Sequence, residues 1–363
     1  MAGQHDFLAM MAALEQGGHP FVVYRPAGGD TVRVLIDGDK SLRVLSDAGT
    51  QRGFVFAPFA SDTVPAVWLS PSATMSFPAA DLPRTRTAEI PDEAYGDEIT
   101  RKQHYMQLVE RAKAEMDEGT IRKIVTSRCV RVPYASLNVA GIFAALAGQY
   151  PGSFVYFFSH PRIGQWMGAT PELLLLRRGD AVHTMSLAGT LPYDGQQMYR
   201  WDAKNVEEQA IVSVFIKDAL ERSGVAAVSV SKPGNQLAGP VVHLCSHISG
   251  QATAATDMNA LLKNLAPTPA LCGYPRRESM DFIRRYEGYP REFYGGYLGE
   301  LNLDAERSAE LYVNIRCMQI TGQEIILYAG GGITLASDAE AEWGETDRKL
   351  RTLGSVIGGF IEL

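Results

Sequence analysis

The hydrophobic pattern of the first 95 residues differs from that of the remaining chain. After a short helix-like start, brief apolar or alternating runs broken by glycine- and aspartate-containing turns predict a meander of short strands, at 21–26, 32–36, 42–45 and 54–56. The prolines between Pro58 and Pro91 fit neither a helix interior nor a central strand, so this passage is expected to wrap the surface. We interpret residues 1–95 as an N-terminal part of the same unit as residues 96–363.

Beyond the proline-rich passage, strands arrive in groups, with helices between and after them. Helical spacing predicts a helix over Glu98–Met116, and Gly119 ends it before the strand-like segment Ile121–Arg128. Further strands are predicted at 154–159, 173–176, 182–187, 241–249, 311–320 and 324–329. Further helices are predicted at 205–222, 257–265, 277–287 and 339–356. Grouped strands without regular βαβ alternation favour an α+β fold with a largely antiparallel sheet.

Composition narrows the class of protein. The 363 residues are 46% hydrophobic and 21% charged, which is typical of a globular protein with a large core. Lys and Arg number 34 against 41 Asp and Glu, and without a basic run we expect no nucleic-acid, membrane or obligatory protein partner. No apolar stretch approaches the roughly 18 to 20 residues of a membrane span, and no secretory signal is evident, so a cytoplasmic location is expected. The four cysteines are far apart and are interpreted as buried free thiols.

Two charged residues stand beside strands that are otherwise apolar. Alternation puts Lys123 on the same face as Ile121 and Val125, so its ammonium group either reaches solvent or acts inside the protein. Glu172 directly precedes the apolar run 173–176 and either faces solvent or lies at the mouth of a buried strand. Charges on faces that should be apolar mark candidate sites.

Acidic residues on two predicted helices could meet at one cation. Glu208 falls at the centre of an apolar stripe, where a carboxylate needs a cation or becomes protonated. In the last helix, Glu342, Glu345 and Lys349 share a face. The simpler explanation is a solvated face with a Glu345–Lys349 salt bridge. The alternative is that the two acidic faces converge on one hard cation such as Mg²⁺.

Three further features are compatible with anion binding. Arg316 shares the polar face of the predicted strand 311–320 with Asn314, where an arginine suits bidentate capture of a carboxylate, although an exposed face also accepts it. The glycine-rich segment 328–333 can present backbone N–H groups to an anion but lacks the P-loop pattern. His243 is either a hydrogen-bonded core residue or a residue that faces substrate.

In this order, these segments resemble the chorismate-binding enzyme family of isochorismate synthases, salicylate synthases, anthranilate synthase large subunits and aminodeoxychorismate synthases. The resemblance runs from about Arg122 to Val356 and implies the anthranilate synthase large subunit-like fold, with 96–363 as the catalytic domain. The matching segments are 123–128, 168–174, 187–190, 204–209, 243–246, 267–273, 294–296, 314–316, 328–333 and 342–349.

The resemblance implies a role for each candidate residue. Glu208 and Glu345 would ligate Mg²⁺, with Glu342 in support, and the metal would hold the ring carboxylate of chorismate. Lys123 would be the general base and Glu172 the general acid. The enolpyruvyl carboxylate would be bound by Arg316, Tyr294 and the amides of Gly330 and Gly332. The remaining substrate contacts would be Gly189, Thr190, His243, Ala270 and Lys349.

Differences within the family favour one activity. Anthranilate synthases carry glutamine where this chain has Lys123 and use ammonia, so a lysine here implies water as the nucleophile. Aminodeoxychorismate synthases use a lysine in the region of 187–190, which has none here. Salicylate synthases tend to have threonine at the position of Ala270. We therefore expect an isochorismate synthase. A salicylate synthase and a non-catalytic carboxylate-binding relative remain the alternatives.

Two points of this resemblance concern pathway and metal affinity. Menaquinone and siderophore synthesis are both compatible with the sequence. Asn205 and Val206 stand where relatives often carry an acid and an arginine, so the charge around the metal is expected to be lower. We expect Asn205 to orient a water there.

Overall fold

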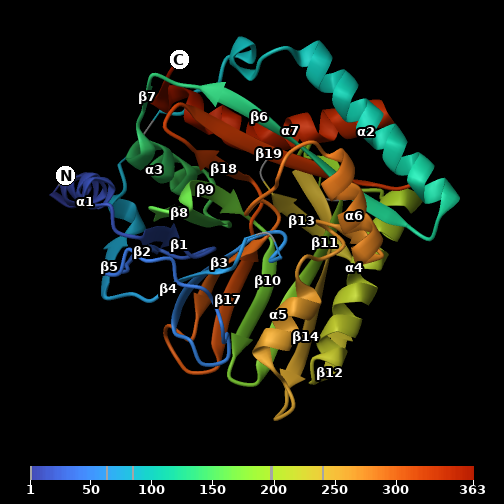
Figure 1. Ribbon diagram of the computed structural model, residues 1–363, viewed down its shortest axis with the longest axis horizontal. Coiled ribbons are helices and arrows are strands. Elements are labelled where there is room, and N and C mark those ends of the chain that lie inside the picture. The colour runs from blue at the N-terminus through green and yellow to red at the C-terminus, as the bar shows by residue number, and fades with distance from the viewer. Residues whose placement is uncertain (1, 63, 84–85, 197–198, 239–240) are drawn as a thin grey trace.

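The computed structural model describes residues 2–62, 64–83, 86–196, 199–238 and 241–363 (Figure 1). Two antiparallel sheets face each other, and helices cover the outer face of each (Figure 1). This four-layer arrangement confirms the predicted α+β fold with large antiparallel sheets. Positions 63 and 84–85 of the proline-rich passage lie outside the described residues.

Each sheet has nine strands, and every pairing between them is antiparallel. The first sheet has the order β15 (Gly273–Tyr274), β6 (Lys123–Pro133), β19 (Glu324–Ile333), β18 (Cys317–Ile320), β9 (Gly164–Thr170), β8 (Phe154–His160), β1 (Phe21–Arg25), β2 (Thr31–Ile36) and β5 (Ala73–Pro78). The second has the order β12 (Val225–Val230), β14 (Val241–Ala252), β11 (Ala181–Pro192), β10 (Leu173–Arg178), β17 (Ser308–Val313), β16 (Tyr297–Leu301), β3 (Gly53–Ala57) and β4 (Val67–Leu69), with β13 (Gly234–Ala238) also paired to β14. A separate pair joins β7 (Ser136–Leu137) to β20 (Ile361–Glu362).

The helices divide between the two outer faces. On the first sheet lie α1 (Ala2–Gly17), α2 (Glu98–Glu118), α3 (Val139–Gln149) and α7 (Ala339–Ile357), whereas α6 (Arg276–Tyr286) contacts β15 and β6 at the edge of that sheet. On the second sheet lie α4 (Ala203–Arg222) and α5 (Met258–Leu265). Short 3₁₀ turns cover Ala79–Asp81, Asp92–Tyr95 and Gly358–Phe360. Within the described ranges, no helix is long and apolar enough to cross a membrane.

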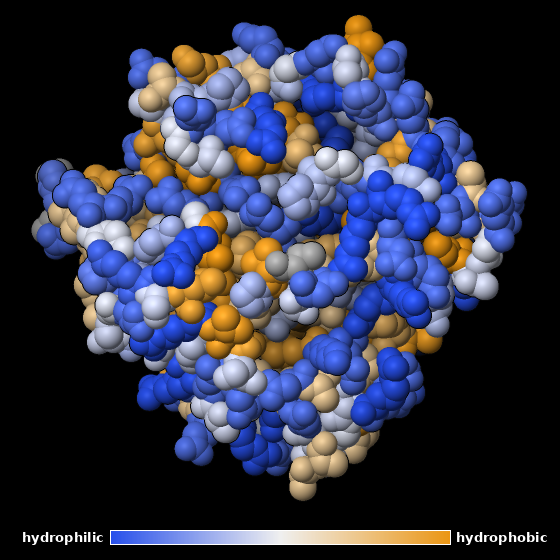
Figure 2. Space-filling view, in the orientation of Figure 1, coloured by the Kyte–Doolittle hydropathy of each residue, from blue (hydrophilic) through white to orange (hydrophobic). Residues whose placement is uncertain are grey.

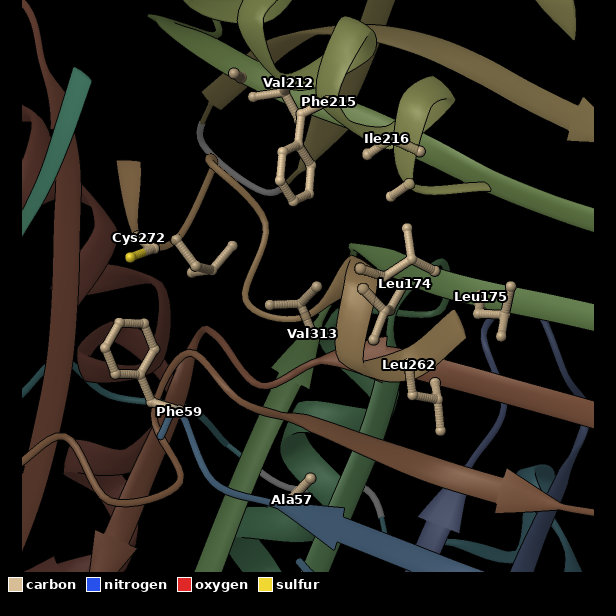
Figure 3. Close-up of a cluster of buried hydrophobic side chains, with 14 of the residues drawn as sticks. Ala57, Phe59, Leu174, Leu175, Val212, Phe215, Ile216, Leu262, Cys272 and Val313 are labelled. Carbon is tan, nitrogen blue, oxygen red and sulfur yellow. The ribbon is translucent and has the colours of Figure 1, made fainter. Parts of the chain in front are cut away.

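Separate clusters of buried apolar side chains hold the layers together. Between the sheets the cluster is largely aromatic, with Phe56 stacked on Phe293 at 4.4 Å between ring centroids. Under α4, the ring of Phe215 points towards the part of the cluster that contains Leu174 of the second sheet, and Val212 belongs to the same cluster (Figure 3). Burial of each such side chain contributes about 1.5 to 3 kcal/mol. This packing fixes the face of α4 that also carries Glu208.

The pattern of hydrophobic and polar residues predicted most helices but missed some helices and strands. The five predicted helices correspond to α2, α4, α5, α6 and α7, with ends that differ by at most two residues. Helix α3 was not predicted, because its sequence is apolar all round and shows no amphipathic stripe. The predicted strand at 42–45 is wrong, since only Val44 forms an isolated bridge there, to Val67. The N-terminal strands pair at the far edges of both sheets.

Candidate active site

A cavity of about 70 Å³ lies between the layers, and both sheets, α4 and α7 contribute to it. All but two of the site residues suggested by the sequence line it, namely Glu172, Gly189, Thr190, Glu208, His243, Ala270, Tyr294, Arg316, Gly330, Gly332, Glu345 and Lys349. The two others, Lys123 and Glu342, lie behind its wall. The fold thus brings together residues that are more than 170 positions apart in the chain.

Lys123 is fully buried at the start of β6. Its Nζ lies 3.0 Å from Oε1 of Glu208, but the angle is poor and the ammonium group has no hydrogen-bond partner among the described atoms. A β-carbon at Gly332 would lie 2.1 Å from that Glu208 oxygen and 2.8 Å from Cε of Lys123. The glycine therefore makes room for the ion pair. The cation that Glu208 requires is thus Lys123 in this structure.

Two more lysine–glutamate pairs surround the site. Lys349 Nζ donates to Oε1 of Glu345 at 2.6 Å and to the carbonyl of Gly330 at 2.8 Å. Burial alone raises the pKa of Glu345, but Lys349 and the cations nearby outweigh it and lower the pKa to about 2. The simpler explanation offered for this helix face, a Glu345–Lys349 salt bridge, is therefore present, although the pair is mostly shielded, with 14% of each side chain exposed.

Glu342 faces a different environment from Glu345. It accepts from Nζ of Lys204 at 2.6 Å and from the hydroxyl of Ser337 at 2.8 Å, and its Oε2 has no hydrogen-bond partner among the described atoms. A β-carbon added at Gly331 would lie 3.0 Å from that oxygen of Glu342. A β-carbon added at the next residue, Gly332, would instead meet Glu208. Successive residues of a strand face opposite sides. Glu342 therefore touches the side of β19 that faces away from Glu208.

Arg316 corrects one prediction about the sheet. The segment 311–320 is not one strand: β17 belongs to the second sheet and β18 to the first, and the chain crosses between them at 314–316. Arg316 has a φ of 49°, a left-handed conformation that is uncommon for a side chain of this size. The break places its guanidinium in the cavity instead of on a sheet face.

The guanidinium of Arg316 is held without a counter-charge. Its Nη1 donates to the hydroxyl of Thr352 at 2.5 Å, and its Nη2 lies 3.4 Å from Nε2 of His243. Among the described residues, no carboxylate lies within ion-pair distance of Arg316, and burial lowers its pKa. A buried cation without an ion pair is a strong candidate to bind an anion.

His243 is a neutral hydrogen-bonding residue. Burial, followed by the charges of Arg316 and Lys349, lowers its pKa to about 3. Its Nδ1 lies 3.1 Å from the carbonyl of Gly189, which can only accept, so Nδ1 carries the proton. Nε2 is then free to accept from Arg316. The neutral ring therefore orients the guanidinium and adds no positive charge.

Asn205 supports the turn that carries Thr190. Its Oδ1 accepts from the backbone N–H of Thr190 at 3.2 Å, and its Nδ2 donates to Asp202 at 2.9 Å. The strand register shifts between Ala188 and Thr190, and Gly189 has a φ of 74°. Asn205 thus uses one acceptor site and one donor to hold this turn.

Glu172 is buried just before β10 and forms no ion pair among the described residues. Burial raises the pKa of its carboxyl group to about 8, against the opposing charges of Lys123, Lys349 and Arg316. Glu172 is therefore mostly protonated at neutral pH, whereas Glu345 in the same cavity is ionised. Carboxyl groups whose environments separate their pKa values in this way are suited to different chemical roles.

The structure adds one functional residue that sequence reasoning missed. Thr352 holds Arg316 and stands seven residues after Glu345 and three after Lys349, on the same face of α7. Extending the helix face defined by those two residues would have found it. Tyr294 also contributes, since its ring stacks on Tyr328 at 5.2 Å and burial raises the pKa of its phenol, which keeps it a neutral donor.

Comparison with known proteins agrees with this geometry. The family model described as chorismate binding enzyme matches residues 69–358. The chain belongs to the chorismate-binding enzyme family. One relative, isochorismate synthase MenF of Escherichia coli K12, is 34% identical over 272 residues, which cover 70% of this chain and 62% of MenF. Isochorismate synthase EntC of the same strain is 30% identical, over 72% of this chain and 68% of EntC.

Solved structures of this family share the fold. The menaquinone-specific isochorismate synthase MenF from Escherichia coli matches with a TM-score of 0.77 at 25% identity, over 93% of this chain and 89% of that one. Anthranilate synthase component I from Streptococcus pneumoniae matches with a TM-score of 0.70 at 17% identity, over 92% and 90%. The likeness to the second structure shows the fold alone.

Proposed function

We propose that this chorismate-binding enzyme is an isochorismate synthase, which converts chorismate reversibly into isochorismate. One observation carries the proposal: the cavity holds a protonated carboxyl group, Glu172, an arginine that forms no ion pair among the described residues, Arg316, and two carboxylates, Glu208 and Glu345. Lys123 lies directly behind Glu208. The names of the two Escherichia coli relatives support the same activity.

Chorismate carries two carboxylates, and the cavity offers a different place for each. The enolpyruvyl carboxylate is assigned to Arg316, whose guanidinium is held by Thr352 and lacks an ion pair among the described residues. Tyr294 and the backbone of Gly330 line the same cavity. In this structure Gly330 presents its carbonyl to Lys349, whose ammonium group adds positive charge at this end of the cavity.

The other carboxylate is assigned to a metal site. Glu208 and Glu345 point hard oxygen ligands into the cavity, and such ligands, completed by water and substrate, are what Mg²⁺ prefers. The side chains therefore fit Mg²⁺, with Glu208 and Glu345 as ligands and Glu342 behind them. When bound, the metal would supply the positive charge that holds the ring carboxylate. Each ligand is now paired with a lysine, so those ion pairs have to open.

Proton transfer is assigned to Lys123 and Glu172. The amine of Lys123 takes a proton from water as the water oxygen bonds to C2 of the ring. The two ring double bonds shift, the C4–O bond breaks, and Glu172 gives its proton to the departing hydroxyl group. One water is consumed and one is released, so the reaction is an isomerisation. In the reverse direction the two residues exchange roles.

Substrate entry requires the site to expand. A cavity of about 70 Å³ is well below the roughly 300 Å³ of a typical small-molecule site. Three of the charged side chains that line it, Glu208, Glu345 and Lys349, belong to the ion pairs Lys123–Glu208 and Lys349–Glu345. We therefore expect these pairs to separate when chorismate and Mg²⁺ bind.

Product analysis tests the proposal. Purified protein is incubated with chorismate and Mg²⁺, and the products are separated by liquid chromatography against authentic standards. Isochorismate should form until the same chorismate–isochorismate mixture is reached from either side. Salicylate and pyruvate as main products would instead identify a salicylate synthase. Unchanged chorismate would indicate a non-catalytic relative.

A further inference from the structure

A second and larger cavity lies away from the candidate active site. It has a volume of about 850 Å³ and is lined by α2, by β6 at Ser127–Cys129 and by the segment Tyr286–Tyr289. No residue lines both cavities. In Figure 2, hydrophilic and hydrophobic side chains lie next to one another in the part of the surface where Figure 1 places α2 and α6. The proposed reaction does not use this space.

The cavity gathers positive charge in a chain whose net charge is −7. Arg101, Arg111 and Arg128 all line it. Its two acids are occupied elsewhere: Glu287 accepts from both Nε and Nη2 of Arg291 at 2.6 Å, and Glu110 lies 3.4 Å from Nζ of Lys113. In the described part of the chain, neither Arg101 nor Arg111 forms an ion pair.

Arg128 is the buried member of this group. It is 8% exposed, and its Nε and Nη2 donate to Thr346 at 2.9 Å and Asp347 at 3.2 Å. Its Nη1 has no hydrogen-bond partner among the described atoms. Arg128 and Arg101 also lie over the same indole ring, that of Trp343, at 3.8 and 5.8 Å from its centroid. Two like charges that lie over one ring favour an anion bound beside them, although the unused Nη1 donor of Arg128 is itself buried and is not exposed to the cavity in this structure.

The remaining walls are suited to a flat ring. Tyr105, Tyr286 and Tyr289 line the cavity together with the apolar side chains of Met106 and Leu108. Arg111 stacks on Tyr286 at 4.5 Å from the ring centroid. Arginine pairs with carboxylates through two parallel hydrogen bonds, and tyrosine rings contact planar ligands over a large area.

We propose that this cavity is a binding site for a small carboxylate that carries an aromatic ring, held by Arg101, Arg111 and Arg128. Arg128 links the site to α7, because it donates to Thr346 and Asp347, which follow Glu345 directly in the helix. A ligand that draws Arg128 towards the cavity weakens these bonds. Its binding therefore changes how readily the backbone hydrogen bonds of α7 open. This helix carries Glu345 and Lys349.

Binding is measured by isothermal titration calorimetry with benzoate. Benzamide, which has the same shape without the charge, and acetate, which has the charge without the ring, serve as matched probes. The titration is repeated with Arg111→Gln, Arg101→Gln, the exposed control Arg122→Gln and the active-site variant Arg316→Gln. We expect saturable binding of benzoate alone, weakened about tenfold or more in Arg111→Gln and Arg101→Gln and retained in the other two.

The variants distinguish binding in this cavity from binding in the candidate active site. Loss of binding in Arg316→Gln but not in Arg111→Gln would place benzoate in the active site and overturn the proposal, as would the absence of saturable binding to the wild type. Equal binding of benzamide would also overturn it. Because this titration needs no turnover, its outcome is independent of whether chorismate is converted.

Hydrogen exchange tests the link to α7. Benzoate should change the exchange rates of backbone amides in Ala339–Ile357 in the wild type but not in Arg111→Gln. Exchange that is unchanged in the wild type at saturating benzoate would refute the link. The control segment is α5, Met258–Leu265, which lies on the other sheet and should not respond.

Discussion

The proposed acid role of Glu172 gives the most direct test of the site. In Glu172→Gln, the amide keeps the shape and the hydrogen-bonding ability of the protonated carboxyl group but cannot supply a proton. Because Glu172 is 4% exposed and protonated at neutral pH, this substitution changes neither the charge of the cavity nor its volume appreciably. We therefore expect folding and chorismate affinity to be preserved.

The magnitude follows from the burial of the carboxyl group. A pKa of about 8 instead of 4.5 corresponds to about 5 kcal/mol that opposes ionisation. At pH 7, about nine in ten Glu172 side chains then carry the proton, against fewer than about one in a hundred for an ordinary glutamate. Loss of a positioned general acid costs about 10²- to 10⁴-fold in turnover. We expect kcat to fall by that factor and KM to change little.

The assay is the initial rate of isochorismate formation across about pH 6 to 10. In the wild type, kcat/KM, which follows the free enzyme, should fall as the pH rises through about 8, because the acid ionises. This alkaline limb should be absent from the residual activity of Glu172→Gln. The exposed Glu207→Gln on α4 is the control and should retain both rate and pH profile. Near wild-type kcat with a raised KM in Glu172→Gln would refute the reasoning, since Glu172 would then only clamp the substrate.

Three other predictions concern the ion pairs and the strand beside them. Lys123→Ala should lose about 10²- to 10⁴-fold in kcat with little change in KM, and a loss confined to KM would contradict the base role. Glu208→Gln and Glu345→Gln should abolish Mg²⁺-dependent turnover while Glu207→Gln retains it, and full wild-type activity in excess chelator would show that no divalent metal is needed. Gly332→Ala should abolish turnover, because its β-carbon would overlap Glu208 at 2.1 Å, whereas Gly322→Ala at an open turn should not; unchanged Gly332→Ala kinetics would show that Glu208 can move freely.

Local sequence patterns were sufficient to predict several helices and two of the site residues of this protein. Helix ends follow from amphipathic spacing and capping residues, which act within a few positions, so α2, α4 and α7 could be predicted closely. The unusual placement of Lys123 and Glu208 was visible because a charge interrupts an apolar face. Helix α3 gave no such signal, because every one of its faces is buried between other elements.

The partner of each charge was decided by the tertiary structure. Lys123 and Glu208 are 85 positions apart, and nothing in either segment indicates the other. They meet because β6 and α4 pack on opposite sides of the cavity. In the same way, the position of α7 pairs Glu342 with Lys204 and places it on the side of β19 that faces away from Glu208. Glu342 nevertheless stands only three residues before Glu345.

The amino-acid sequence by itself determined the family, the α+β class and which residue types could carry acid–base and anion-binding chemistry, since these depend on local order along the chain. Only the folded chain decided that Arg316 leaves its strand, because the break at 314–316 exists to carry the chain from one sheet to the other. It also decided that Glu172 is protonated and Glu345 ionised. Burial and neighbouring charge set a pKa, and both are properties of residues that are distant in sequence and adjacent in space.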